Sequence, residues 1–475
     1  MNRYAITALA LSVSSGCAVP ALAQGATEPD AAAVARELAD LRAQMKAMAS
    51  RIDSLESRLA EANARAEAAS VAADRARDSA AGMADSVASQ AADLAEARAK
   101  AMAPSVDIAW KGAPVITGEG GWSFKVRGRV NLDAGFFDAP DSAGRDDGFS
   151  SEVRRARLGV EGTIPGGFGY KFEAGFGSDL AITDAFLTYE DKGLTVTVGH
   201  QNPFQSLEEL TSSLYLPFTE RAAFTDAFGF ERRVGASLSY EAGDLLLQGG
   251  VFTDNYAALP NSNLSFDGRV VYAPKLGGAQ LHLGASLHRT DLNGDGASVR
   301  YRQRPFLHGT DERFIDTGLI AASGETGLGL ESAVIAGRLD VSGEAFWQSV
   351  SRPGLADPTF FGGYVQVGYF LTEGDSRAYK HGMFGRVKPA RPFGEGGIGA
   401  VQVSARYDYL DLSDEGIIGG RQKSYQLALA WSQTDYTKLF LSYAHLEYDA
   451  AVHPAAGDDR SYGVDTMAVR AQVDF

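Results

Sequence analysis

Basic side chains recur at alternate positions in the segment that begins near residue 122. An extended strand turns successive side chains to opposite faces, so residues two apart share a face. A row of fixed positive charge beside a narrow water-filled passage raises the local concentration of anions. We therefore predict a pathway for small anions, and its candidate residues are Lys125, Arg127, Arg129, Arg155, Arg157, Arg221 and Arg233.

A second interpretation of the same residues is structural. The same face also carries one more lysine and three carboxylates: Lys171, Asp133, Glu161 and Glu173. Arginines that pair with these carboxylates would only stabilise the wall of the passage. Both interpretations can hold at different depths along the passage. Arg154 falls on the opposite face in this register, so it must sit at a bulge or at an interface.

Motifs for covalent, nucleotide or metal chemistry do not occur in the sequence. It has no Gly-x-Ser-x-Gly, His-Glu-x-x-His or Walker sequence, and its seven histidines are scattered without metal-ligand spacing. Residues 394–399 fit a dinucleotide-binding pattern but lead into a strand, so we interpret them as a turn. Asp291, Asp295, Asp458 and Asp459 could bind a divalent ion, although solvated turns are commoner. We predict no catalytic residue, no metal and no cofactor.

Residues 122–475 alternate apolar and polar side chains, with turns rich in Gly, Asp, Asn and Pro between the runs. Many runs reach about nine to twelve residues, the length that a tilted strand needs to cross a bilayer. A sheet can span lipid only when it closes on itself. The fold class is therefore all-β, a transmembrane antiparallel β-barrel of about sixteen strands, with eighteen as the next candidate. Aromatics near strand ends could form interfacial girdles: Trp122, Phe136, Phe137, Tyr189, Trp431 and Tyr448.

The first 23 residues resemble a cleavable signal peptide, with Arg3, an apolar stretch at 6–13 and a small-residue site at 21–23. Cys17 allows a lipoprotein anchor as an alternative, although the usual upstream leucine is missing. Cleavage after residue 23 would leave no cysteine, and hence no disulfide or thiolate metal site. Beyond the signal no run of 18 apolar residues occurs, which excludes a helical inner-membrane protein.

Residues 30–102 are predicted to form a periplasmic α-helical coiled coil, joined to the barrel by a linker at 103–121. Apolar residues recur there at alternating spacings of four and three, as in a heptad seam. A single helix packed on a globular domain is the alternative, but it would show a wider stripe. The seam does not fix the number of helices. It consists of Val34, Leu38, Leu41, Met45, Met48, Ile52, Leu55, Leu59, Ala62, Ala66, Ala69, Ala73, Ala76, Ala80, Met83 and Val87.

The composition agrees with an exported β protein. The 54 glycines, 18 tyrosines and 25 phenylalanines favour a many-stranded sheet. The formal net charge of −16 argues against a general nucleic-acid binder, whose surface should be basic.

Several motifs together resemble the phosphate-selective porins O and P, in order and in spacing. They are IAWKGAP at 108–114, FKVRGR at 124–129, RRARLGVEG at 154–162, ITDAFL at 182–187, VGHQ at 198–201, GYVQVGYFLTE at 363–373 and the end from 462 to 475. The resemblance implies a sixteen-stranded homotrimeric channel for small anions. It also implies a constriction loop at 202–230, where residues 214–218 (LYLPF) replace the lysine expected of a phosphate-selective member.

The sequence therefore predicts a passive outer-membrane porin for small hydrophilic solutes that prefers anions such as phosphate. Its expected partners are outer-membrane lipid, two further copies in a homotrimer and, through the coiled coil, peptidoglycan or another periplasmic component. The alternative from another class is a structural envelope tether, or trimeric scaffold, with a general, non-selective pore. A hydrolase in a barrel is a third class that the missing motifs disfavour.

Overall fold

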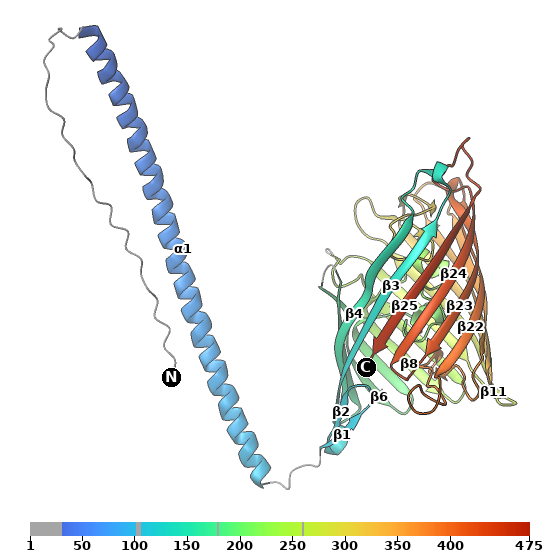
Figure 1. Cartoon of the computed structure of the whole chain (residues 1–475). Coiled ribbons are helices and arrows are strands. Elements are labelled where there is room, and N and C mark those ends of the chain that lie inside the picture. Colours follow the sequence, from blue (N-terminus) through green and yellow to red (C-terminus); the bar gives the residue numbers. More distant parts are fainter. Residues whose placement is uncertain (1–30, 101–105, 178–179, 259–260) are drawn as a thin grey trace. The chain divides into compact units, whose positions relative to one another are not determined.

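The computed structural model describes residues 31–100, 106–177, 180–258 and 261–475 (Figure 1). The chain divides into two compact units, Met1–Ala103 and Pro104–Phe475. The predicted signal peptide at 1–23 lies outside the described residues.

The first unit contains one long helix, α1 (Ala31–Lys100). Its sequence is rich in Ala, Leu, Arg and Glu and has no proline, which suits an uninterrupted helix. Every side chain described in it, from 35 to 94, is exposed, including the seam residues Leu38, Leu41 and Met45. No helix among the described residues combines the length and apolar character needed to cross a membrane.

The second unit is a closed antiparallel barrel. Its last strand pairs with its first, since Val473 lies opposite Val130. The described residues supply sixteen barrel strands, which confirms the predicted fold class. These are β3 (Ser123–Asp138), β4 (Gly148–Ile164), β5 (Phe168–Phe176), β6 (Leu180–Asp191), β7 (Leu194–Gln201), β8 (Arg233–Ala242), β9 (Leu245–Phe252), β10 (Leu264–Tyr272), β12 (Ala279–Asp291), β17 (Gly324–Ala336), β18 (Leu339–Ser351), β19 (Thr359–Phe370), β22 (Ala400–Asp414), β23 (Ile417–Ser432), β24 (Thr437–Asp449) and β25 (Gly463–Asp474).

Most connections at one end of the barrel are short hairpin turns, and the longest connections, 202–232 and 292–323, lie at the other end. A typical short turn is Lys192-Gly193, where both residues have positive φ (47° and 85°) as a tight hairpin requires. The short-turn end also carries β1 (Asp107–Trp110) and β2 (Pro114–Thr117), which extend the sheet from the start of β3. The long segment 371–399 is the exception at this end, because it joins β19 to β22.

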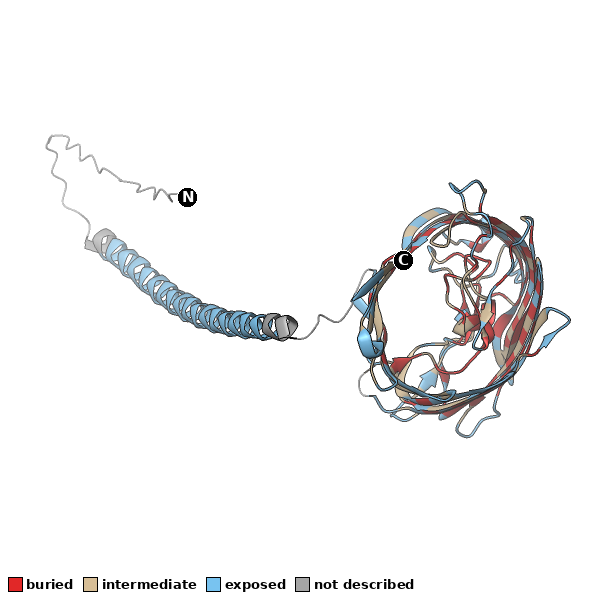
Figure 2. Cartoon of the chain, turned by 90° about the horizontal axis from the view of Figure 1, so that it is seen from below, coloured by how far each residue is buried: buried red, intermediate tan, exposed pale blue. Residues whose placement is uncertain are grey.

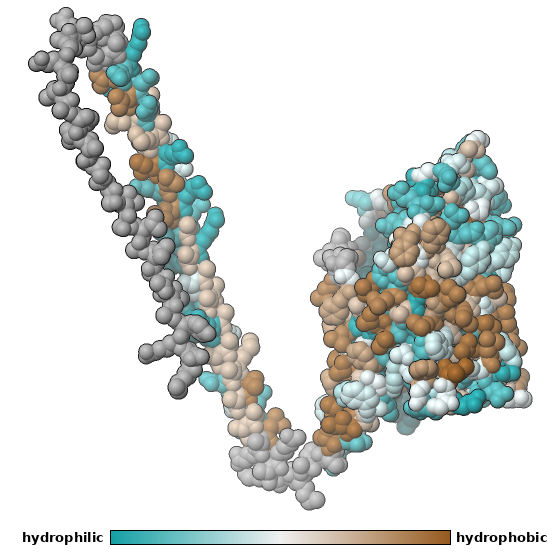
Figure 3. Space-filling model, viewed as in Figure 1, coloured by the Kyte–Doolittle hydropathy of each residue, from teal (hydrophilic) through white to brown (hydrophobic). Residues whose placement is uncertain are grey.

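The outer surface of the barrel has an apolar belt (Figure 3). Period-two alternation produces it: in β25, Met467, Val469 and Val473 are exposed, whereas Arg470 and Gln472 are buried inside. Apolar outward and polar inward is the pattern of a lipid-embedded barrel.

The prediction of an interfacial girdle is wrong for two of its residues. Phe136 and Trp122 are exposed, but Phe137 and Tyr448 are buried, because the strand register turns them into the lumen. There they join a hydrophobic cluster with parts of the long connections.

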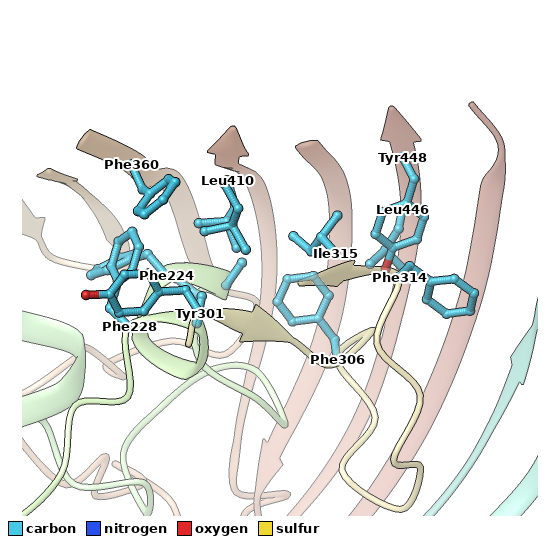
Figure 4. Packing of buried hydrophobic residues seen from close by; sticks show 14 of the residues in the cluster. Phe224, Phe228, Tyr301, Phe306, Phe314, Ile315, Phe360, Leu410, Leu446 and Tyr448 are labelled. Atoms are coloured by element: carbon cyan, nitrogen blue, oxygen red, sulfur yellow. The ribbon is translucent and has the colours of Figure 1, made fainter. Parts of the chain in front are cut away.

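This cluster fills part of the lumen (Figure 4). It brings together α3 (Ala223–Ala227), which carries Phe224, and the segment 292–323, which carries Tyr301 and Phe314. Wall residues of β18, β19, β22 and β24 complete it: Phe346, Phe360, Leu410 and Leu446. A view along the barrel shows chain segments crowding one side of the ring, on the right of Figure 2. That part of the barrel interior is therefore a packed core rather than an open channel.

Candidate functional site

The segment 202–232, between β7 and β8, lies inside the lumen, as expected for a constriction loop. It holds α2 (Leu207–Leu210) and α3. Its hydrogen bonds reach strands all round the wall: Ser213 accepts from Arg129 on β3 at 3.2 Å, Gln205 donates to Asp267 on β10 at 3.0 Å, and the Leu214 carbonyl accepts from Lys438 on β24 at 3.1 Å. The loop thus crosses the passage and narrows it.

A second segment, 371–399, enters the lumen from the short-turn end. It forms the small hairpin β20 (Tyr379–Lys380) and β21 (Met383–Phe384). The Phe384 N–H donates to Thr211 Oγ1 of the constriction loop at 3.2 Å, and Arg377 pairs with Asp340 at 3.0 Å. Sequence reasoning missed this segment, although its length at the end of short turns was a signal.

Four of the predicted cations lie on the lumen face of β3 and β4. Arg127 pairs with Glu161. Arg129 and Arg157 share one carboxylate, because each donates to Glu173 at 3.1 Å. Lys125 lines a cavity beside them and has no ion pair among the described residues.

A β-bulge explains the adjacent arginines Arg154 and Arg155. Asn131 pairs with Arg155 and Leu132 with Val153, so Arg154 is the extra residue and both side chains can turn inward. Arg154 binds Glu220 of the constriction loop through two bonds, at 3.0 and 3.1 Å. Arg155 differs: its buried Nη1 has no hydrogen-bond partner among the described residues.

The remaining two predicted cations are bound elsewhere. Arg221 folds back on its own loop, donating to the carbonyls of Glu208 and Thr211 at 3.1 and 2.9 Å and pairing with Glu209 at 3.2 Å. Arg233 donates to hydroxyl groups of β10 and β12, including Thr290 Oγ1 at 3.0 Å. Arg233 is therefore not grouped with the cations of β3 and β4.

Two arginines outside the candidate set complete the charge network. Arg470 is almost fully buried and joins Asp133 to Glu220, at 2.6 and 2.9 Å. Arg232 shares Asp184 with Lys171, at 2.7 and 2.6 Å. The alternating polar face of the last strand pointed to Arg470, but its partner, 250 residues away along the chain, had no sequence signal.

Two cavities lie along the wall that carries these cations. One, of about 700 Å³, is lined by β3–β6 residues including Lys125, Glu161 and Lys171. The other, of about 370 Å³, is lined by the bulge and the constriction loop, with contributions from the segment 292–323. Its charged lining residues are Arg154, Arg155, Glu209, Glu220, Arg221, Asp226, Glu231, Arg304 and His308.

The two loop carboxyls in the smaller cavity differ in acidity. Burial would raise the pKa of Glu220, but the guanidinium groups of Arg154, Arg470 and Arg155 hold that pKa well below its usual range. Burial raises the pKa of Glu209, and the nearby Arg221 opposes this without reversing it. Glu220 is therefore a permanent anion, while Glu209 gains a proton more readily than an ordinary glutamate.

No group of three or more His, Cys, Asp or Glu side chains that could hold a metal ion occurs in the described part of the chain. The site is a set of fixed charges around a narrowed passage, an arrangement that can select and pass ions.

A closed sixteen-stranded barrel, an apolar outer belt and an inward loop across a charged lumen define a porin. The chain belongs to the family described as phosphate-selective porin O and P, whose model matches residues 124–475. This confirms the resemblance drawn from the motifs. The chain is an outer-membrane channel and not an enzyme.

Relatives extend over most of the chain. An uncharacterized protein of Caulobacter vibrioides is 43% identical over 484 residues, covering 98% of this chain and 95% of the relative. Porin O of Pseudomonas aeruginosa is 25% identical over 391 residues, covering 73% and 88%. The solved anion-selective porin from Comamonas acidovorans aligns with 74% of this chain and 100% of its own, at 15% identity and a TM-score of 0.49.

Proposed function

We propose that this channel is a passive pore for small hydrophilic solutes that prefers anions. The observation that carries the proposal is the unpartnered Nη1 of Arg155, which belongs to a side chain lining the cavity at the constriction loop. Most lumen cations nearby are paired with carboxylates, whereas Arg155 and Lys125 have no ion pair among the described residues. Because the Arg155 side chain lines the cavity, its positive charge can attract a passing anion.

Phosphate and related anions are the proposed solutes. The family's description as phosphate-selective agrees with anions, and Arg-rich sites suit phosphate oxygens. The loop stretch 214–218 carries no lysine, but Lys438 reaches its Leu214 carbonyl from β24. That lysine is buried and already bound, so we assign the selectivity to arginine.

The test is the zero-current potential of the purified protein in planar bilayers under a KCl gradient, repeated with added phosphate. We expect a potential that reports chloride over potassium, and a conductance that phosphate blocks at low concentration. Cation preference would refute the anion proposal. Chloride preference without phosphate block would leave an anion channel with no phosphate site.

The proposal also assigns roles to the segments before the barrel and an oligomeric state to the barrel. Residues 1–23 direct export, residues 30–102 form a periplasmic coiled coil, and the barrel at 122–475 assembles as a homotrimer in the outer membrane. The exposed apolar seam of α1 favours association with further copies of the same helix. The coiled coil then contacts peptidoglycan or another periplasmic component.

A structural envelope tether with a non-selective pore is the second candidate, and the 70-residue helix α1 is the observation that favours it. Deletion of residues 34–101 distinguishes the porin from the structural tether. A tether loses its envelope phenotype while the barrel still conducts, whereas a porin with a dispensable helix keeps normal envelope stability.

A further inference from the structure

Two buried carboxylates of the barrel wall accept backbone N–H groups of the constriction loop. Glu344 of β18 accepts from Leu207 N at 2.9 Å and from Glu208 N at 2.8 Å, one bond to each oxygen. Asp408 of β22 accepts from Ala223 N at 2.9 Å. The two wall residues therefore hold the loop near its first and last thirds.

The loop's own carboxylate, Glu208, ties these two attachment points together. One of its oxygens accepts from Ala222 N at 2.7 Å, beside the residue that Asp408 holds. The other pairs with Arg406 on β22, which is itself bound to Gln366 Oε1 at 2.8 Å. The two parts of the loop, 207–208 and 222–223, are thus joined to each other and to neighbouring strands on one side of the barrel wall.

Burial makes these contacts strong and mutually dependent. Glu344 and Asp408 have exposed fractions of 7% and 0%, and a buried carboxylate without donors is costly. Glu344 receives a third bond, from the Tyr364 hydroxyl at 3.0 Å. Since three donors point at its two oxygens, loss of either oxygen would leave a buried donor unpaired. The loop supplies hydrogen-bond donors to the buried wall carboxylates, and these carboxylates supply acceptors to the N–H groups of the loop.

We infer that Glu344 and Asp408 are positioning residues that fix the constriction loop and thereby set the size and charge of the passage. Neither residue lines the two cavities, so neither is required to touch the permeating ion. By fixing residues 207–208 and 223, they also place Glu209, Glu220 and Arg221 opposite Arg154 and Arg155. The inference rests on the channel activity and not on the anion preference proposed above.

The test compares substitutions that remove acceptors with one that keeps an acceptor. Glu344→Gln can accept only one of the two N–H groups, and Asp408→Ala accepts none. Asp408→Asn keeps one carbonyl oxygen for Ala223 N, and the other Asp408 oxygen has no partner among the described residues to lose. Glu447→Gln, on the exposed outer face of β24, is the control for loss of a carboxylate.

Single-channel recordings of the full chain in planar bilayers give the readout. For Glu344→Gln and Asp408→Ala we expect a broader conductance distribution, open-channel noise raised about twofold or more, and a smaller ion preference, because the loop samples several positions. Asp408→Asn and Glu447→Gln should match the wild type. Lower heat stability with unchanged conductance and noise in Asp408→Ala would overturn the inference and leave a stabilising role only.

A variant of the loop itself covers the case in which Asp408→Ala fails to fold. Ala223→Pro removes the donated N–H, and Ala222 already has the φ of −55° and ψ of 147° that a residue before proline requires. We expect the same noise as for Asp408→Ala, and no further increase in the double variant. Additive effects would contradict the inference. The sign of the wild-type zero-current potential tests the anion proposal separately.

Discussion

Arg155 differs from its neighbours because it forms no ion pair among the described residues, although the surrounding arginines look alike in sequence. We expect Arg155→Gln to lower the anion-to-cation permeability ratio roughly two- to fivefold, since a unit charge a few ångströms from a solvated ion is worth about 1 kcal/mol. Zero-current potentials under a KCl gradient measure this ratio. Arg421→Gln is the control, because Arg421 pairs with Asp449 on the exposed surface; an equal effect there would exclude a local role for Arg155.

Glu209 gives the passage a dependence on pH. Burial raises its pKa, so it takes up a proton as the pH falls toward the ordinary glutamate range and before Glu220, whose pKa is lowered. The loop then loses a negative charge, and the anion preference should rise as the pH falls from neutral toward the ordinary glutamate range. Permeability ratios recorded across this range test the direction. Glu209→Gln should show the higher preference already at neutral pH, with a flatter response.

At the scale of elements, the segment that carries the hairpin β20–β21 contacts the constriction loop from the short-turn end, and the buried pair Arg377–Asp340 fixes this segment to β18. Arg377→Ala leaves Asp340 buried without its cation, although Gln402 still donates to it at 2.7 Å. We expect a loss of about 3 kcal/mol in the free energy of unfolding, measured by denaturant titration in detergent micelles. Arg289→Ala, which breaks an exposed pair with Asp291, should cost less than about 1 kcal/mol.

The strands could be predicted from sequence, and the inward segments could not. Alternation alone assigned Arg129 and Val469 to opposite faces, because lipid on one side and water on the other leave a strict pattern. It also required a bulge or an interface at Arg154. The girdle prediction for Phe137 and Tyr448 came instead from their positions near strand ends, where an aromatic that packs on a lumen loop resembles one in a girdle. The pairings Arg470–Glu220 and Glu344–Leu207 depend on how loops fold back, which no local periodicity encodes.

At the scale of the whole molecule, the chain has two units that differ in whether their apolar residues are already packed within the unit. The barrel contains its own packed core and closed sheet, whereas α1 exposes its apolar seam from Leu38 to Val87. A peptide of residues 31–100 should therefore gain helicity with concentration as its copies associate. Circular dichroism and sedimentation equilibrium across a dilution series measure this. Leu41→Ser with Ile52→Ser should abolish the dependence, and a helicity that does not change with concentration would contradict association.

The pairing between β3 and β25 also determines when the barrel can close. Arg470 and Asp133 meet there across 337 positions of the chain, and the backbone of Phe475 pairs with Gly128. Contacts so distant along the chain form slowly, because a large loop must close first. Ring closure must therefore wait for the last strand to be available. A chain that loses β25 leaves β24 and β3 as two open edges, so its product is aggregated protein rather than a narrower pore.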